Sequence, residues 1–262
     1  MNFQKKLNNI ECEDIVSNLD LNKNDIVYVC SDIREILIDA KKNKIKFNLD
    51  DFIDSIIKKI GSGGTILFPT FNWGFCKNKT FDYIKTPSQC GSLSNHALKR
   101  KDFKRTKHPI YSFSVWGKDQ QKLIDMDNTS SWDESSPFYY LFRKKAKNLF
   151  IGLDYKNGFT MDHYFEQKNN VEYRYHKDFR ANYIDKEGKI EKKTYSMFVR
   201  DIKKVDVTGI SSSLDSILIK NDGYKKYIIN NIHYGIINLE IAGNIIDNDL
   251  KENKVLIYPI KN

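Results

Sequence analysis

Residues 48–71 read NLDDFIDSIIKKIGSGGTILFPTF. Apolar side chains recur at helical spacing after Asn48, which is a favourable N-cap, so a helix is predicted to run to about Ile60. The glycine cluster at 61–64 ends it, because glycine adopts the left-handed conformation that a helix C-terminus needs. The apolar run at 65–71 then predicts a buried strand.

A second apolar run lies upstream, at residues 26–30, and is rich in β-branched side chains. Strand, helix, glycine turn and strand in this order predict a βαβ unit with parallel strands. The glycines follow the helix and do not open one, so they are no dinucleotide or phosphate-loop motif. We therefore expect an α/β fold, layered α/β/α, with a central mixed and largely parallel sheet.

The rest of the chain continues in short apolar and amphipathic segments without repeats or linkers. We expect one domain over residues 1–262, with a possible small lobe at about 171–200 built on a β-hairpin in the C-terminal half. Further strands are predicted at 112–116, 148–153, 236–239 and 254–258, helices at 13–20, 94–101, 119–126, 136–144 and 242–250, and the hairpin at 181–198.

The composition is that of a globular protein, with 40% hydrophobic and 29% charged residues among 262. No apolar run approaches the length of a membrane span, and residues 1–6 are not followed by the apolar segment of a secretory signal. We expect a cytoplasmic protein. The four cysteines show no zinc-site spacing, so we expect reduced thiols and no metal.

Lysine and arginine exceed aspartate and glutamate by 43 − 34 = 9. A basic balance suits nucleic acid, a membrane surface or an anionic small molecule. Much of the excess lies in short lysine runs typical of solvated faces, and no nucleic-acid motif accompanies them. We therefore expect a small-molecule partner, with neither nucleic acid nor membrane.

Polar residues follow two of the predicted elements in places where ligands bind. Ser31 and Asp32 end the strand at 26–30, which is compatible with a ligand site or with a simple helix cap. Arg105 suits a phosphate, although taken alone it is better explained as a surface arginine.

Residues 158–166 place Thr160, His163 and Glu166 at intervals of three. In a helix these side chains share a face, and a histidine flanked by an acid and a hydroxyl forms a usable catalytic set. A structural histidine on an amphipathic helix is the alternative. The segment follows the strand at 148–153, a position that favours a site.

In this order the motifs resemble the aminoglycoside 3-N-acetyltransferases and their wider group of antibiotic N-acetyltransferase-like enzymes. The similarity spans about residues 25–180. It rests on 29–34, 64–71, 86–88, 91–94, 105–113, 136–137 and the stretch from Gly152 to Glu166.

The resemblance implies an acyl-coenzyme A donor, acetyl-CoA by family habit, an amine acceptor and no metal. His163 matches the histidine that acts on the amine, Glu166 matches its supporting acid, and Thr160 joins them as a catalytic candidate. The donor-binding candidates are Ser31, Asp32, Arg34, Phe71, Arg105, His108 and Ser136. Cys30, at a strand end, is the alternative nucleophile.

The acceptor is expected to be an amino sugar, and a nucleotide-linked one suits the basic charge. Asn95 stands where the family commonly has glutamate, which an aminoglycoside with several ammonium groups would need. The segment 171–179 resembles a branch found beside sugar-biosynthesis genes, although an exposed basic strand explains its cations too. The acceptor-binding candidates are Trp73, Asn95, Arg174, His176 and Lys177. An aminoglycoside acceptor and a catalytically idle nucleotide- or glycan-binding relative are the alternatives.

Overall fold

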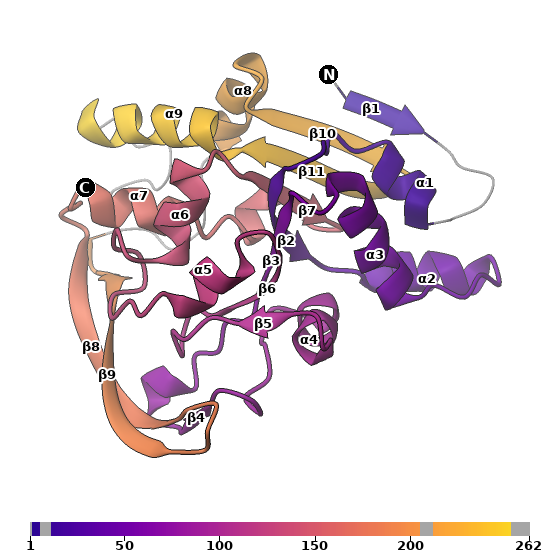
Figure 1. Ribbon diagram of the computed structural model, residues 1–262. Coiled ribbons are helices and arrows are strands. Elements are labelled where there is room, and N and C mark those ends of the chain that lie inside the picture. Colours follow the sequence, from indigo (N-terminus) through magenta and orange to yellow (C-terminus); the bar gives the residue numbers. More distant parts are fainter. Residues whose placement is uncertain (1, 6–11, 205–211, 253–262) are drawn as a thin grey trace.

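The computed structural model describes residues 2–5, 12–204 and 212–252 (Figure 1). Its described strands form a large mixed sheet and a small one. In spatial order the large sheet contains β1 (Asn2–Lys5), β10 (Tyr224–Ile229), β11 (Ile232–Asn238), β7 (Lys147–Ile151), β2 (Ile26–Ser31), β3 (Thr65–Pro69), β6 (Phe113–Gly117) and β5 (Lys104–Arg105).

The centre of the large sheet is the predicted parallel unit. β2 pairs in parallel with β3 on one side and with β7 on the other. Along the chain, β2 is connected to β3 through α2 (Arg34–Lys42) and α3 (Leu49–Ile60). Asn48 caps α3 by accepting a hydrogen bond from the backbone N–H of Asp50 at 2.9 Å, and Gly61 follows at φ +69°. The βαβ prediction is confirmed, with α2 as an additional helix.

Fewer strand pairs of the large sheet are parallel than the sequence predicted. Outward from the centre, β6 pairs antiparallel with β3, and β11 pairs antiparallel with β7. The pairings β5 with β6 and β10 with β11 are antiparallel as well, while β1 adds in parallel to β10. A two-residue turn joins β10 to β11, a connection that only an antiparallel pair allows.

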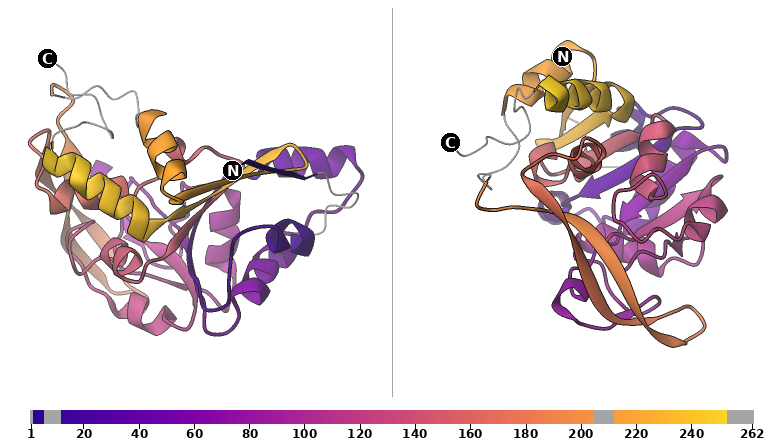
Figure 2. Two further views of the ribbon diagram at one scale, coloured as in Figure 1. Left: turned by 90° about the horizontal axis from the view of Figure 1, so that it is seen from above. Right: turned by 90° about the vertical axis from the view of Figure 1, so that its left-hand side faces the viewer.

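Helices cover both faces of the large sheet, as the layered prediction requires. Along β2, Val27 and Val29 face one core, and Tyr28 and Cys30 face the other, because successive side chains of a strand alternate. Figure 2 shows α9 on the opposite side of the sheet from α1 and α3. The remaining helices are α1 (Cys12–Ser17), α4 (Ser92–Lys99), α5 (Gln120–Asp125), α6 (Pro137–Arg143), α7 (Asp162–Lys168), α8 (Ser212–Lys220) and α9 (Leu239–Glu252), with short 3₁₀ turns η1 (Phe75–Lys77) and η2 (Tyr155–Asn157).

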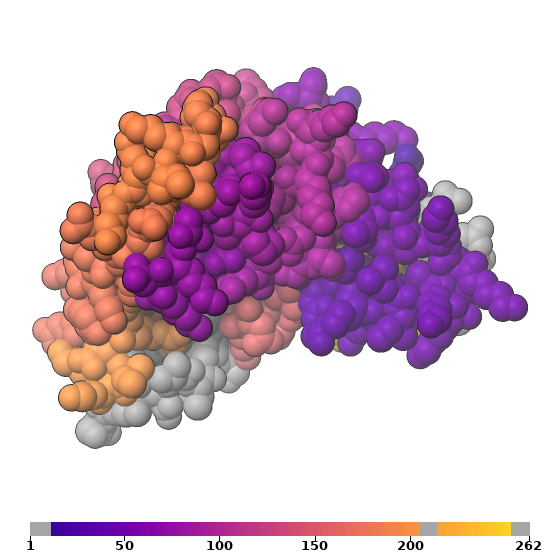
Figure 3. Space-filling model, turned by 90° about the horizontal axis from the view of Figure 1, so that it is seen from below, coloured from indigo at the N-terminus to yellow at the C-terminus, as the bar shows by residue number. Residues whose placement is uncertain are grey.

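The predicted hairpin is longer than expected. β8 (Arg174–Ile184) and β9 (Ile190–Arg200) pair along their whole length, and β4 (Phe81–Asp82) joins β8 to make the small sheet. Figure 3 shows this hairpin in orange against the purple segment that contains β4. Its inner side chains, including Tyr183 and Phe198, belong to the same core cluster as one face of the large sheet.

The predicted last strand, 254–258, lies outside the described residues. Within the described ranges, no helix is long and apolar enough to cross a membrane.

Candidate functional site

The site begins where β7 ends. The chain turns at Gly152, whose φ is +65°, passes through η2 and enters α7 at Asp162. Thr160 precedes this helix, so the prediction that it shares a helical face with His163 is wrong. Its backbone oxygen instead accepts a hydrogen bond from the backbone N–H of His163 at 3.3 Å.

His163 and Glu166 meet as predicted, since both lie in α7. The Nδ1 atom of His163 lies 2.9 Å from Oε2 of Glu166 and 3.0 Å from Oδ1 of Asp162. The two carboxylate oxygens at Nδ1 favour the tautomer that carries its proton there and none on Nε2, and they outnumber the one donor that also faces Nδ1, Nη2 of Arg174 at 2.9 Å. The imidazole is 17% exposed, while the Glu166 side chain is completely buried.

Arg174 completes this cluster from the start of β8. Its Nη2 lies 2.7 Å from Oε2 of Glu166 and 2.9 Å from Nδ1 of His163, and its Nη1 donates to the backbone oxygen of Phe198 at 2.8 Å. The sequence placed Arg174 among acceptor-binding cations on an exposed strand. Its side chain is only 3% exposed, because the hairpin folds this end of β8 against α7, so it is not available as a surface anchor.

Burial dominates the proton affinities at the cluster. It lowers the pKa of His163 from 6.5 to about 3, an effect that Asp162 opposes and Arg174 reinforces. It raises the pKa of Glu166, and Arg174 opposes that rise by favouring the carboxylate. His163 is therefore neutral at ordinary pH.

Three potential metal ligands occur together here. One ligand atom each from Asp162, His163 and Glu166 lies within 4.8 Å of the others. The guanidinium of Arg174 already neutralises Glu166 at this point, so the cluster has a cation of its own.

A pocket of about 310 Å³ lies beside the cluster, at the carboxyl ends of β2 and β3. None of the described residues that line it carries a charged side chain. The residues that line it are Tyr28, Cys30, Ser31, Pro69, Phe71, Trp73, Gln89, Cys90, Leu153, Asn157, Gly158 and Thr160. Ser31 is prominent because its hydroxyl is buried and has no hydrogen-bond partner among the described residues.

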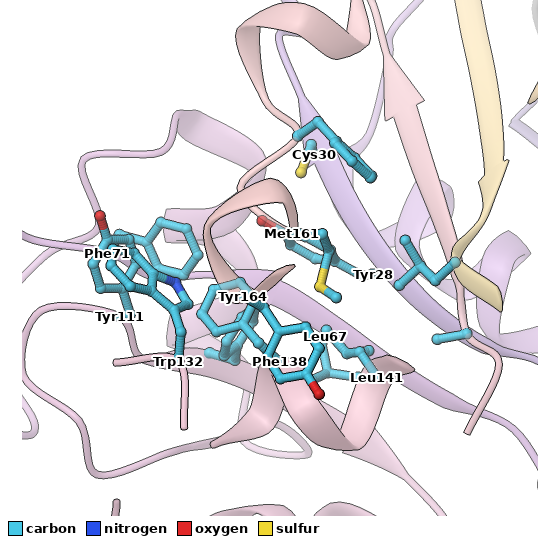
Figure 4. Packing of buried hydrophobic residues seen from close by; sticks show 14 of the residues in the cluster. Tyr28, Cys30, Leu67, Phe71, Tyr111, Trp132, Phe138, Leu141, Met161 and Tyr164 are labelled. Atoms are coloured by element: carbon cyan, nitrogen blue, oxygen red, sulfur yellow. The ribbon is translucent and has the colours of Figure 1, made fainter. Parts of the chain in front are cut away.

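Aromatic side chains connect the pocket wall to His163. Phe71 packs against Tyr111 with ring centroids 4.8 Å apart, and Tyr111 packs against Trp132 at 4.8 Å. Trp132 lies edge-on to the His163 ring at 5.0 Å. Figure 4 shows Phe71, Tyr111 and Trp132 as one group, with Tyr28 and Cys30 farther along the same core. A continuous series of ring contacts therefore links Phe71, in the pocket lining, to His163.

The strand-end candidates are arranged around this pocket. Ser31 and Phe71 line it. Asp32 is turned toward Arg34, whose Nε donates to Oδ1 of Asp32 at 2.9 Å, and the Arg34 side chain is 83% exposed. The Arg34 guanidinium is thus paired with Asp32 but remains exposed to solvent.

Three other donor-binding candidates are buried as parts of the scaffold. Arg105 donates to backbone oxygens of Tyr83, Thr86 and Thr70 and to the hydroxyl of Ser112. Its guanidinium is enclosed, so Arg105 is not the exposed phosphate-binding residue that the sequence suggested. It instead holds neighbouring loops together.

His108 and Ser136 have local structural partners as well. The Nδ1 of His108 accepts from the backbone N–H groups of Ile110 and Tyr111, and burial lowers its pKa to about 3. Ser136 is the N-cap of α6 and accepts from the N–H of Tyr139. Neither side chain faces the pocket lining described above, so neither is kept in the proposed donor site.

The acceptor-binding candidates are dispersed. Trp73 lines the pocket and is 38% exposed. Asn95 braces the preceding loop through Ser88 and Gly91, which occupies its amide group. His176 and Lys177 are exposed on β8. The structure does not bring these four together.

Sequence reasoning missed Asp162, Trp132 and Tyr111. Asp162 adjoins His163 in the sequence, and a carboxylate next to a candidate base was a usable signal. Trp132 lies in a loop with no distinguishing pattern, and the 105–113 motif that contains Tyr111 does not indicate what this ring contacts. Only the folded chain places Trp132 against the histidine and Tyr111 against Trp132.

Comparisons with known proteins identify the family and the fold of this chain. A profile of the family described as aminoglycoside 3-N-acetyltransferase matches residues 40–217. The crystal structure of aminoglycoside acetyltransferase AAC(3)-Xa has a TM-score of 0.77 at 14% identity, over 96% of this chain and 94% of that one. AAC-IIIb in binary complex with CoASH has a TM-score of 0.76 at 14% identity, over 95% and 98%.

YokD from Bacillus subtilis has a TM-score of 0.73 at 20% identity, over 93% of both chains. A comparison with curated proteins gives no significant match. At these identities the solved structures establish the fold, while the profile covers more than half of the sequence. The chain belongs to the aminoglycoside 3-N-acetyltransferase family of acyl-CoA-dependent N-acetyltransferases.

Proposed function

We propose that this protein transfers the acetyl group of acetyl-CoA to an amine of an aminoglycoside-type amino sugar, with His163 as general base. The observation that carries the proposal is the 2.9 Å contact between Nδ1 of His163 and Oε2 of Glu166, beside an uncharged pocket. The family match and the CoASH complex of AAC-IIIb support the donor.

The pocket suits the middle part of the donor. The pantetheine arm of coenzyme A is uncharged and carries amides, and the pocket offers the hydroxyls of Ser31 and Thr160 and the amides of Gln89 and Asn157. Arg34, three residues after Ser31 and exposed to solvent, is proposed to bind the phosphates outside the pocket. The buried Arg105 has no part in this arrangement.

His163 would act through its Nε2 atom. An amine at neutral pH is mostly protonated, so nitrogen must lose a proton as it attacks the thioester carbon. Neutral His163 accepts that proton, and Glu166 stabilises the imidazolium that forms. Thr160, at the junction of pocket and helix, is proposed to assist the oxyanion or the departing thiolate.

Two solved relatives support the aminoglycoside acceptor: AAC-VIa bound to sisomicin and a mutant of AAC(3)-IVa in complex with a gentamicin. The second candidate acceptor is a nucleotide-linked amino sugar, which the formal charge of +9 favours because it attracts phosphates. For that acceptor, the exposed Lys177 and His176 are the candidate binding residues.

The test is release of coenzyme A thiol from acetyl-CoA with a panel of amines. The panel contains gentamicin, sisomicin, a nucleotide-linked amino sugar and no amine, the last correcting for hydrolysis and for the half-buried thiols of Cys12 and Cys76. Release with the aminoglycosides is expected. Thiol release with the nucleotide-linked sugar alone would show that this sugar, and not an aminoglycoside, is the acceptor. No thiol release with any amine would indicate a catalytically idle binding protein.

A further inference from the structure

We propose that Arg174 is a positioning residue for His163: it holds Glu166 as an ionised, correctly oriented acceptor for the Nδ1 proton. The inference rests on the proposed role of His163 as general base. Arg174 is not part of the helix that carries His163 and Glu166, and it reaches them from β8 across 2.7 Å and 2.9 Å contacts.

The geometry fixes the guanidinium on two sides. Nη2 is directed at Glu166, while Nη1 donates to the backbone oxygen of Phe198 at 2.8 Å on the neighbouring strand β9. With 3% of its side chain exposed, Arg174 has little freedom to turn toward solvent or a ligand. The hairpin therefore orients the carboxylate of Glu166, and through it the imidazole of His163.

The charge of Arg174 sets which group carries the proton. A buried carboxylate without a counter-ion tends to become a neutral carboxylic acid. Protonated Glu166 would donate a hydrogen bond to Nδ1 of His163, and the imidazole proton would then sit on Nε2. A histidine in that tautomer cannot accept a proton from the amine. Arg174 has only N–H donors, and its Nη2 faces both Oε2 of Glu166 at 2.7 Å and Nδ1 of His163 at 2.9 Å. Donation to the nearer, charged Oε2 keeps Glu166 ionised and leaves Nδ1 to donate its own proton to the carboxylates, which is the reactive tautomer.

The surrounding groups do not replace this charge. Asp162 faces Nδ1 from the start of α7 and carries a negative charge of its own. Tyr173 precedes Arg174 and contacts the Glu166 carboxyl group as a neutral phenol. Arg200, the cross-strand partner of Arg174, adds positive potential at both His163 and Glu166, but the 2.7 Å ion pair belongs to Arg174.

The kinetic test compares Arg174→Gln with Arg174→Lys. Arg174→Gln should lower kcat by at least ~100-fold, the loss expected when a general base is disabled, with the KM values for acetyl-CoA and amine nearly unchanged. Arg174→Lys should recover part of kcat because it restores the charge. Arg180→Gln, the same change at an exposed position of β8, is the matched control and should keep full activity. A raised KM with unchanged kcat would make Arg174 a substrate contact and overturn the inference.

A second measurement does not depend on turnover. Nitrogen-15 NMR of protein labelled in its five histidines, with the His163 signal identified by its loss in His163→Gln, reports the tautomer directly. We expect the Nδ1–H form in the parent protein and the Nε2–H form in Arg174→Gln. An unchanged tautomer in a folded Arg174→Gln protein would overturn the inference.

The two readouts separate the proposals. A parent protein that acetylates no amine contradicts the proposed function, while the tautomer still tests Arg174. Should Arg174→Gln fail to fold, Arg174→Met takes its place in both measurements, because it also removes the charge while keeping an unbranched side chain. A folded Arg174→Met protein with full kcat and the Nδ1–H tautomer would overturn the inference.

Discussion

The Nδ1 atom of His163 and the Oε2 atom of Glu166 are 2.9 Å apart, one turn from each other on α7. The contact is made in a site where Glu166 is completely buried and the imidazole keeps one accessible edge. This arrangement leaves Nε2 as the atom that can meet a substrate.

Replacing His163 by alanine should lower kcat by at least ~100-fold, because the general base is lost, and should leave the affinity for coenzyme A nearly unchanged. Steady-state kinetics and calorimetric titration with coenzyme A measure the two quantities. His233→Ala, at an exposed position of β11, is the control and should behave like the parent. A fully active His163→Ala enzyme would remove the histidine from the mechanism.

Cys30→Ala should retain kcat within about tenfold, well above the loss caused by removing a general base. Burial raises the pKa of the Cys30 thiol to about 12, and the thiol donates to the backbone oxygen of Gly158 at 3.3 Å, so a thiolate is absent at neutral pH. Single-turnover assays without amine check the same point. Accumulation of an acetylated protein that requires Cys30 would establish the alternative covalent route.

Arg105→Met should reduce stability and spare donor binding. It leaves the backbone oxygens of Tyr83, Thr86 and Thr70 without their guanidinium donor, and each unsatisfied buried group costs ~1–3 kcal/mol. The free energy of unfolding in urea should fall by at least ~2 kcal/mol while KM for acetyl-CoA stays constant.

Arg34→Met should leave stability nearly unchanged and weaken donor binding. Its exposed pair with Asp32 contributes little to stability, whereas loss of the proposed phosphate contact should raise KM for acetyl-CoA. If Arg105→Met raised KM and left stability intact, the phosphate role first assigned to Arg105 would be reinstated.

Gly152→Ala should destabilise the protein more than Gly188→Ala. Both glycines have positive φ, so both changes incur the left-handed strain of ~1–2 kcal/mol. At Gly188 a Cβ atom meets open space, but at Gly152 it would lie 2.0 Å from the backbone oxygen of Asp32. Comparing the melting temperatures of the two variants separates the backbone strain, which both share, from the steric clash, which only Gly152→Ala has. Equal decreases in melting temperature would show that the backbone around Asp32 moves aside without cost.

Acid should destabilise the fold through its buried histidines. Burial lowers the pKa of His108 and His163 to about 3, whereas an unfolded histidine titrates near 6.5. Between these values the unfolded chain binds more protons, so stability present above pH 6.5 is lost as pH falls toward 3.

Each of these histidines should contribute a loss of about 2 kcal/mol between pH 7 and pH 5. His108→Asn keeps an acceptor for the N–H groups of Ile110 and Tyr111, and urea unfolding at the two pH values should show a smaller decrease than in the parent. An identical decrease in both proteins would mean that His108 is protonated in the folded state.

What the amino-acid sequence determined by itself was local or periodic. The strand at 26–30, the capped helix ending near Ile60 and the strand after the glycines follow from side-chain spacing and capping within a few residues of each other. The contact between His163 and Glu166 was visible for the same reason, since one helical turn brings them together.

Only the tertiary structure decided which polar residues face the site. Arg105 and Arg174 have the same chemistry in the sequence, yet one braces three loops and the other pairs with Glu166. Thr160, expected on the helix, lies before it beside Ser31 from a distant strand. These outcomes depend on contacts between segments far apart in the chain, and burial by those contacts turns an apparently exposed cation into a structural or a positioning group.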